Sequence, residues 1–183
     1  VRMAMALKEI GTDSPMIAFL SEKIAFTYNG ELIFGNCQDE PSGKLTFSVN
    51  QIDLSSFGET IGIDARIPVT VDKKFIVDGI TRVAEKYGLE YEELDYLAPL
   101  YIEKSSELIQ VLTQVYVEET GLSGEPTASG GATYARSMKN IVAFGPAFPG
   151  QEKVSHQTDE YFDLNAMIKC AQIYAKSIEK LIK

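Results

Sequence analysis

SGGATYAR, at residues 129–136, is the stretch around which this chain is organised, because a glycine pair, a threonine and an arginine lie within eight residues. It is followed by NIVAFGPAF at residues 140–148, by the single histidine, His156, and by a helix that we expect from about Asp163. Neighbouring glycines let a ligand approach the backbone, and their N–H groups can point at an anion. We interpret these segments as one wall of a catalytic pocket whose other wall lies outside this chain.

The second half of the chain is predicted to contain a helix, two strands and a closing helix. Apolar residues at helical spacing predict a helix from Ser105 to about Thr120 that ends at Gly121. Residues 125–128 are a candidate short strand, and the apolar run at residues 141–144 is typical of a strand buried on both faces. The closing helix is predicted from a long, regular apolar stripe, which consists of Leu164, Met167, Ile168, Ala171, Tyr174, Ala175, Ile178, Leu181 and Ile182. This order suits the closing part of a larger α/β sheet.

The first hundred residues predict a unit of helices and antiparallel strands. Residues 2–10 favour a helix, and Ser14 and Pro15 suit the N-cap and first turn of the next one. Residues 32–43 are predicted to be a loop. Alternating apolar residues predict antiparallel strands at 44–54 and 61–69, and a helix should span residues 72–87.

Residues 90–96 are weakly typical of a further strand. Strand, strand, helix and strand are the content of a ferredoxin-like α+β unit with part of it absent. The predicted fold class of the whole chain is therefore α/β (α+β).

The composition argues against several kinds of partner and site. With 17 Lys and Arg against 26 Asp and Glu, the formal net charge is −9, so we do not expect nucleic acid to be bound. Cys37 and Cys170 lack a Cys-x-x-Cys spacing, which argues against a structural zinc site or a disulfide framework. No apolar run approaches the roughly 18 residues of a membrane-spanning helix, and the N-terminus has no signal-peptide pattern. We expect a cytoplasmic protein without a membrane partner, and a fragment, because Val1 falls inside a predicted helix.

His156 is the most informative candidate residue. A lone histidine is most often a surface or core residue, but this one follows a predicted strand, where α/β proteins bind ligands. Asp159 and Glu160 lie close by in the sequence and a carboxylate can fix the tautomer of an imidazole that binds zinc. A catalytic zinc site needs about three protein ligands, so this chain cannot assemble a histidine-based site alone.

Two arginines are candidate anion-binding residues. Arg136 lies five residues after Gly131, and its guanidinium could grip a carboxylate bidentately. Arg66 lies on the polar face of a predicted strand and becomes a clamp if that face closes over a pocket. The simpler alternatives are a tight turn at the glycines, a surface salt bridge at Arg136 and a solvent-facing side chain at Arg66.

Four groups of residues form a specific combination, although each one alone is loose. They are DARIP at residues 64–68, SGGATYAR at 129–136, AFGP at 143–146 with FPG at 148–150, and HQ at 156–157 with DEY at 159–161. Together they resemble the C-terminal part of the bacterial PepV-type zinc dipeptidases, which are relatives of the aminoacylase and carboxypeptidase metalloenzymes. The resemblance covers most of the chain and is densest from residue 59 onward.

This resemblance implies a catalytic α/β domain with two adjacent zinc ions, interrupted by a lid domain of ferredoxin-like units. Residues 1–100 would be the second half of the lid, and residues 101–183 the C-terminal segment of the catalytic domain. His156 would be the last zinc ligand, and Arg66 a catalytic lid arginine that also holds the substrate. The substrate-binding loop would contain Gly130, Gly131, Thr133 and Arg136. The other zinc ligands and the general-base glutamate would lie in an N-terminal half that is absent here.

The implied activity is hydrolysis of dipeptides with a free carboxylate, with zinc, or else manganese or cobalt, as the cofactor. The missing N-terminal half would be a partner of this chain, which should be inactive alone. Two alternatives remain open. The chain could be a stand-alone module that binds a small carboxylate through Arg66 or Arg136 without chemistry. It could also be a structural fragment whose stability depends on the missing half.

Overall fold

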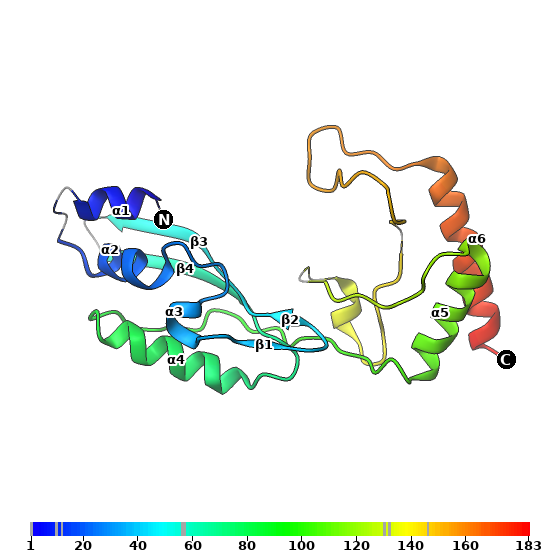
Figure 1. Ribbon diagram of the computed structural model, residues 1–183, viewed down its shortest axis with the longest axis horizontal. Helices are drawn as coiled ribbons and strands as arrows, with labels where there is room; N and C mark the ends of the chain where they lie inside the picture. Colours follow the sequence, from blue (N-terminus) through cyan, green and yellow to red (C-terminus); the bar gives the residue numbers. More distant parts are fainter. Residues whose placement is uncertain are drawn as a thin grey trace. The chain divides into compact units, whose positions relative to one another are not determined.

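The computed structural model describes residues 2–9, 11, 13–55, 58–129, 131, 133–145 and 147–183. The chain divides into two compact units, one containing Val1–Pro99 with Ala128–Gly131 and the other Leu100–Thr127 with Ala132–Lys183 (Figure 1). Helices predominate, with two small antiparallel sheets in the first unit. The predicted mixture of helices and strands is therefore confirmed.

The first unit begins with the predicted helices. Helix α1 spans Arg2–Glu9, and α2 spans Pro15–Phe19 and continues as a π-helical turn over Leu20–Ile24. Ser14 is the N-cap of α2, as predicted: its Oγ accepts a hydrogen bond from the backbone N–H of Ile17 and donates one to Glu59 Oε2 at 2.9 Å. A single serine thus fixes the start of α2 and joins it to the following sheet.

A long hairpin forms the main sheet of this unit. Strands β3 (Thr46–Ser55) and β4 (Gly58–Arg66) pair antiparallel, as predicted, although β4 ends earlier than expected, two residues before Pro68. A bulge interrupts the register, because Val49 is opposite Ile63 while Gln51 is opposite Gly62. Asn50 is the extra residue.

The bulge changes which residues of β3 share a face. Residues directly opposite each other in an antiparallel pair lie on the same face. Phe47 is opposite Ala65 before the bulge, and Ile52 is opposite Ile61 after it. Because Ala65 and Ile61 share one face of β4, the extra residue places odd-numbered Phe47 and even-numbered Ile52 on that same face.

Helix α4 (Lys73–Glu85) contributes Ile76, Ile80 and Val83 to the core of the first unit. Asp72 caps it through a hydrogen bond from the N–H of Lys74, as the sequence predicts. The core between α2, the hairpin and α4 is apolar; its buried members are Met16, Ile17, Phe19, Leu20, Ile24, Phe34, Cys37, Leu45, Phe47, Ile76, Ile80 and Val83.

Residues 32–43 are more ordered than the predicted loop. They contain most of a short helix, α3 (Glu31–Phe34), and a two-residue ladder between β1 (Gln38–Asp39) and β2 (Gly43–Lys44). Asp39 holds this ladder to the segment before α4, since its carboxylate accepts hydrogen bonds from Ser42 and from Thr70. The sequence prediction was wrong here because elements of two to four residues are too short to leave a periodic pattern.

The second unit contains helices α5 (Glu107–Thr120) and α6 (Leu164–Leu181), which pack against each other. Ser106 and Asp163 cap their N-termini, and Gly121 ends α5 in the left-handed conformation. Three ion pairs join the helices: Glu119 with Lys169 and with Lys176, and Glu118 with Lys180. Both helices were predicted, and both are confirmed.

Three predicted strands are absent from the described residues: 90–96, 125–128 and 141–144 have no strand assignment. Leu94 is 86% exposed, and the run at 141–144 is half-buried or exposed rather than buried on both faces. A strand forms only where its backbone groups pair with a neighbour, and no neighbouring strand is available to these segments in the described part of the chain. Among the described residues, no helix is long and apolar enough to cross a membrane.

Candidate functional site

His156 lies in an irregular segment between the second unit's 3-10 turn and α6. Its backbone has a φ of 64°, and Asp159 nearby has a φ of 59°. Non-glycine residues adopt this left-handed conformation uncommonly, and such residues concentrate at functional sites. The N–H of His156 donates a hydrogen bond to Glu160 Oε2 at 3.2 Å, so the predicted neighbour does contact it, through the backbone rather than the imidazole.

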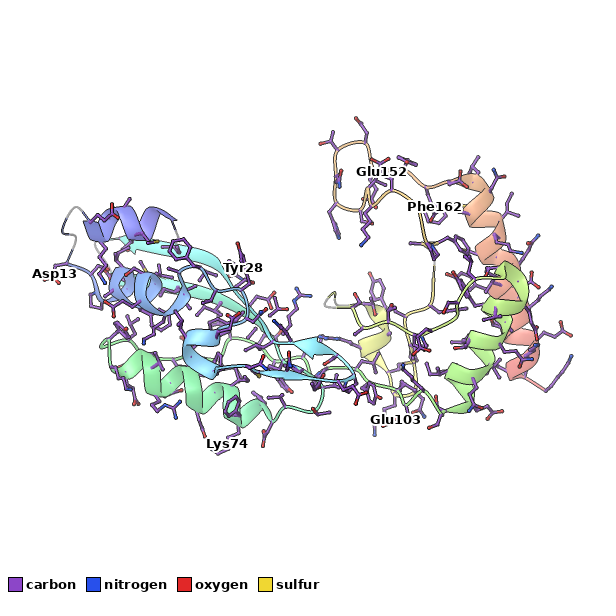
Figure 2. All side chains as sticks on the ribbon, in the orientation of Figure 1. Asp13, Tyr28, Lys74, Glu103, Glu152 and Phe162 are labelled. Carbon is purple, nitrogen blue, oxygen red and sulfur yellow. The ribbon has the colours of Figure 1, made fainter. Side chains whose placement is uncertain are left out.

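Further hydrogen bonds brace the segment on either side of His156. The Tyr161 hydroxyl donates to Glu152 Oε2 at 3.2 Å, and the Gln157 side chain donates to the carbonyl of Lys153 at 2.8 Å. Glu152 and Phe162 mark the course of the segment toward α6 in Figure 2. These contacts give the segment a defined path although it has no regular secondary structure.

The described residues of this chain do not form a complete metal site. His156 is exposed, and the described residues contain no group of three or more His, Cys, Asp or Glu side chains that could hold a metal ion. A zinc site requires about three such ligands. The role of His156 as a metal ligand therefore stays a prediction.

Thr133 and Arg136 lie together on a 3-10 turn over Tyr134–Ser137. Thr133 caps the turn by accepting a hydrogen bond from the N–H of Ala135, which is buried. The Arg136 side chain is half-buried, and no hydrogen bond or ion pair to its guanidinium is found among the described residues. The role of Arg136 in binding an anion stays a prediction.

Of the glycine pair, Gly130 lies outside the described residues. The N–H of Gly131 donates a hydrogen bond to Ser129 Oγ at 3.2 Å. That N–H group is therefore engaged within the loop rather than directed at an anion.

Arg66 is the last residue of β4, opposite Thr46. Its guanidinium pairs with Asp64 at 3.1 Å, and both side chains are about two-fifths exposed, at 43% and 41%. Exposed pairs of this kind contribute little stability, so the pair does not fix Arg66 strongly. Arg66 and Gly131 belong to the first unit, whereas Thr133, Arg136 and His156 belong to the second, so neither unit contains the whole predicted set.

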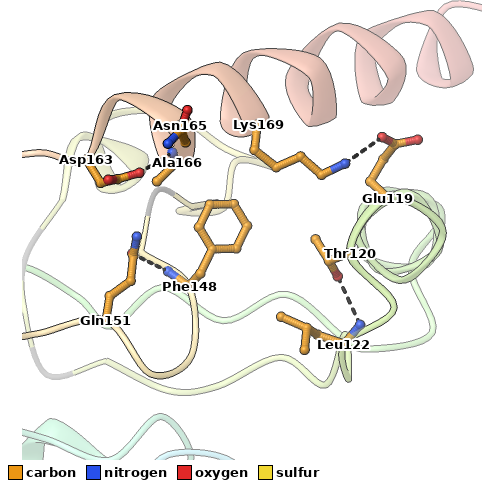
Figure 3. A pocket seen from close by; sticks show the side chains of 9 residues that line it. All are labelled: Glu119, Thr120, Leu122, Phe148, Gln151, Asp163, Asn165, Ala166 and Lys169. Carbon is orange, nitrogen blue, oxygen red and sulfur yellow. Dashed lines mark hydrogen bonds and ion pairs between the residues drawn. The ribbon is translucent and has the colours of Figure 1, made fainter.

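The second unit also has an open cavity of about 380 Å³ between α5, α6 and the segment at residues 148–151 (Figure 3). Its lining residues are Glu119, Thr120, Leu122, Phe148, Gln151, Asp163, Asn165, Ala166 and Lys169. None of the predicted site residues is among them. Phe148 of the FPG motif lines the cavity, but the motif alone does not predict it, because the other lining residues come from segments that are distant in sequence.

The glycine-containing segment at residues 144–151 is held between the two helices. Phe148 stacks on Tyr116 of α5, with ring centroids 6.2 Å apart, and Phe144 contacts the ring of Tyr174 of α6 at 5.9 Å. Burial raises the pKa of the Tyr174 hydroxyl, which donates a hydrogen bond to the carbonyl of Phe144. The motif residues Phe144 and Phe148 thus act as packing anchors for the loop.

Comparison with known proteins identifies the family. Residues 8–180 match peptidase family M20/M25/M40. The chain is 33% identical over 168 residues to "Putative dipeptidase YtjP" of Bacillus subtilis, with 91% of this chain and 36% of that protein covered. It is 29% and 27% identical to "Putative dipeptidase SSP1012" of Staphylococcus saprophyticus and "Putative dipeptidase SH1171" of Staphylococcus haemolyticus, each over 93% of this chain and 36% of the relative. This chain therefore spans about a third of the length of these relatives, and it belongs to peptidase family M20/M25/M40.

Proposed function

We propose that this chain is part of a zinc-dependent dipeptidase that hydrolyses dipeptides with a free carboxylate. The observation that carries the proposal is the family match over residues 8–180, together with the dipeptidase names of the relatives. Members of the family are generally metal-dependent. Zinc is the metal that best suits an imidazole donor here, with manganese and cobalt as the other candidates.

In this proposal each candidate residue keeps a distinct role. His156 is one ligand of the metal, and its left-handed backbone sets the direction of the segment that precedes α6. Arg136 binds the substrate's carboxylate, supported by its half-buried position and by the absence of a described partner. Arg66 helps to hold the substrate, and Gly130, Gly131 and Thr133 belong with Arg136 to the substrate-binding loop.

The rest of the site must come from outside this chain. Because the chain spans only 36% of its relatives, we propose that a partner segment of the same protein supplies the remaining metal ligands and the general base. Residues 1–100 would then be part of a lid and residues 101–183 part of the catalytic domain of a cytoplasmic enzyme. The chain alone would be inactive.

The direct test is a substitution of His156 in the complete gene product. Asparagine is the informative replacement because it tolerates a φ of 64° while removing the imidazole. We expect His156→Asn to lower dipeptide hydrolysis by more than about 100-fold and to lower bound zinc, since even residues that only support a metal ligand cost 10–100-fold. Lys153→Ala, exposed in the same segment, is the matched control. Unchanged turnover and metal content in His156→Asn would refute the proposal.

Arg136, which has no partner among the described residues, also favours a second function, carboxylate binding without chemistry. Calorimetry with a metal-free dipeptide solution distinguishes carboxylate binding without chemistry from dipeptide hydrolysis. A binding module predicts heat of binding that Arg136→Gln abolishes and no hydrolysis in the complete gene product with added zinc. The dipeptidase predicts turnover under those conditions.

A further inference from the structure

The residues that follow His156 have no role in the hydrolysis proposed above, but they close a loop around it. The Tyr161 hydroxyl donates a hydrogen bond to Glu152 Oε2 at 3.2 Å, so a side-chain contact joins two residues that are nine positions apart. The loop between them, residues 152–161, contains neither helix nor strand. Compact loops of this length whose ends lie close together frequently carry functional residues.

Inside this loop, further hydrogen bonds surround His156. The N–H of Gln157 donates to the carbonyl of Val154 at 3.1 Å, and its side chain donates to the carbonyl of Lys153 at 2.8 Å. The N–H of His156 itself donates to Glu160 Oε2 at 3.2 Å. In each of these bonds the donor and the acceptor are three or four residues apart, so the loop holds its path with its own residues.

The bond from His156 to Glu160 spans two residues in the left-handed conformation, His156 with a φ of 64° and Asp159 with a φ of 59°. This conformation costs free energy in any residue with a Cβ, because the Cβ lies too close to the following carbonyl oxygen. A residue other than glycine keeps it only where the surrounding contacts fix it. The Glu160 carboxylate is such a contact, since it accepts the N–H of the left-handed residue directly.

The Glu160 carboxylate contacts the backbone of His156 and not its ring. Among the residues that the structure describes, neither ring nitrogen of His156 has a hydrogen-bond or ion-pair partner. A carboxylate on the ring would occupy one nitrogen and select a tautomer, whereas a carboxylate on the backbone leaves both nitrogens open. Glu160 is therefore placed to fix the backbone that carries the imidazole rather than to change the basicity of the ring.

We propose that Glu160 is a positioning residue for His156: it holds the His156 backbone in the left-handed conformation and so sets the place from which the imidazole binds the metal. The bond between Tyr161 and Glu152 supports it by closing the loop. The inference rests on the proposed function in taking His156 as a metal ligand. A ligand that is already fixed loses less freedom on binding, so breaking the bond should weaken metal binding although every ligand is still present.

Two substitutions of Glu160 in the complete gene product isolate this hydrogen bond. Glu160→Gln keeps an acceptor oxygen and removes the charge, whereas Glu160→Ala removes both. The probe is zinc alone, and its affinity is measured by competition with a chromophoric chelator, without substrate. We expect Glu160→Ala to bind zinc about tenfold more weakly or worse, and Glu160→Gln to stay within about threefold of the unsubstituted protein. Lys153→Ala, exposed in the same loop, is the control and should bind zinc normally.

Unchanged zinc affinity in Glu160→Ala would overturn the proposal. Equal weakening in Glu160→Ala and Glu160→Gln would overturn it as well, because the charge and not the bond to the backbone would then be the cause. If Glu160→Ala lacks the circular dichroism of the unsubstituted protein, Tyr161→Phe takes its place, since it removes only the hydroxyl that closes the loop. It should weaken zinc binding by about threefold, whereas Tyr28→Phe, at a position that is 82% exposed, should not.

Comparison with His156→Asn keeps the positioning role of Glu160 apart from the metal role of His156. If His156→Asn loses zinc and Glu160→Ala does not, the positioning role is refuted and the dipeptidase proposal stands. If neither variant loses zinc, the metal role of His156 fails, and the positioning of a metal ligand fails with it. Hydrogen exchange of the His156 amide in the metal-free protein then reports the backbone contact alone: it should be faster in Glu160→Ala and unchanged in Glu160→Gln.

Discussion

The Tyr174 hydroxyl donates a 2.8 Å hydrogen bond to the carbonyl oxygen of Phe144, and so joins α6 to a loop thirty residues earlier in the chain. Removing only the hydroxyl, in Tyr174→Phe, should lower the free energy of unfolding by about 1 kcal/mol, the usual contribution of one hydrogen bond. Hydrogen exchange of residues 144–151 should rise with it. Tyr134→Phe is the control, because Tyr134 is 96% exposed. Equal effects of the two substitutions would show that the bond does not hold the loop.

Gly145 and Gly150 provide a matched pair in the same loop. Both have positive φ, at 78° and 85°, so alanine strains the backbone at each position. At Gly145 a Cβ would also clash with the Tyr174 hydroxyl oxygen, whereas at Gly150 no atom lies within 4 Å of it. Gly145→Ala should therefore destabilise the protein more than Gly150→Ala, by about 1 kcal/mol or more. Chemical denaturation of both variants measures the difference, and equal midpoints would contradict it.

The ion pairs of Glu119 make the packing of α5 on α6 dependent on pH. Hydrogen bonds from Lys176 and Lys169 lower the pKa of Glu119 below its ordinary value of 4.5. A carboxyl whose pKa is lowered in the folded state stabilises the fold above its unfolded pKa, and this stabilisation is lost as the pH falls through the folded value. Glu119→Gln should therefore lower the unfolding midpoint at pH 7 and have little effect near pH 3.

The exposed Glu92 supplies the control for that experiment. Glu92→Gln should change the midpoint little at either pH. High salt should reduce the effect of Glu119→Gln, because it screens the exposed lysines. A difference between wild type and Glu119→Gln that persists unchanged at pH 3 would argue against the ion pairs as its cause.

Ser14 joins the start of α2 to Glu59 on β4. Ser14→Ala removes the cap and leaves the N–H of Ile17 without its acceptor, so it should lower the free energy of unfolding by about 1–2 kcal/mol. Ser14→Thr keeps the hydroxyl and should recover most of the loss. Thermal unfolding of the two variants, measured together, checks the prediction. An equal loss in both would indicate that crowding at this buried position, rather than the cap, controls stability.

Local signals allowed much of the fold to be predicted from the sequence. Ser14, Asp72 and Asp163 mark the starts of helices, because each side chain can accept a hydrogen bond from a backbone N–H two or three residues later. All three of these caps are found in the structure. The strands predicted at 90–96, 125–128 and 141–144 are absent because a strand depends on a neighbour, which a local apolar pattern cannot supply. Strands β1 and β2 were missed because each is only two residues long, too short for a pattern of alternating side chains.

The candidate site was harder to predict than the helices. The motifs were sufficient to indicate the family, but they carry no information on the left-handed backbone of His156 or on the hydrogen bond from the Gly131 N–H to Ser129. The cavity beside Phe148 was missed altogether, because its lining is assembled from three distant segments. Residue type can be read from a sequence, whereas the orientation of a group depends on its neighbours.

The extra residue at Asn50 has a consequence for comparing homologous chains. A homologue that lacks the residue at this point loses the bulge but keeps the pairing on either side, with Val49 opposite Ile63 and Ile52 opposite Ile61. Its apolar side chains should therefore stay at the positions that correspond to Ile52 and Leu54, with Val49 and Ile52 separated by two positions instead of three. Alignments of this hairpin should place their gap at Asn50 and leave the positions beyond it in register.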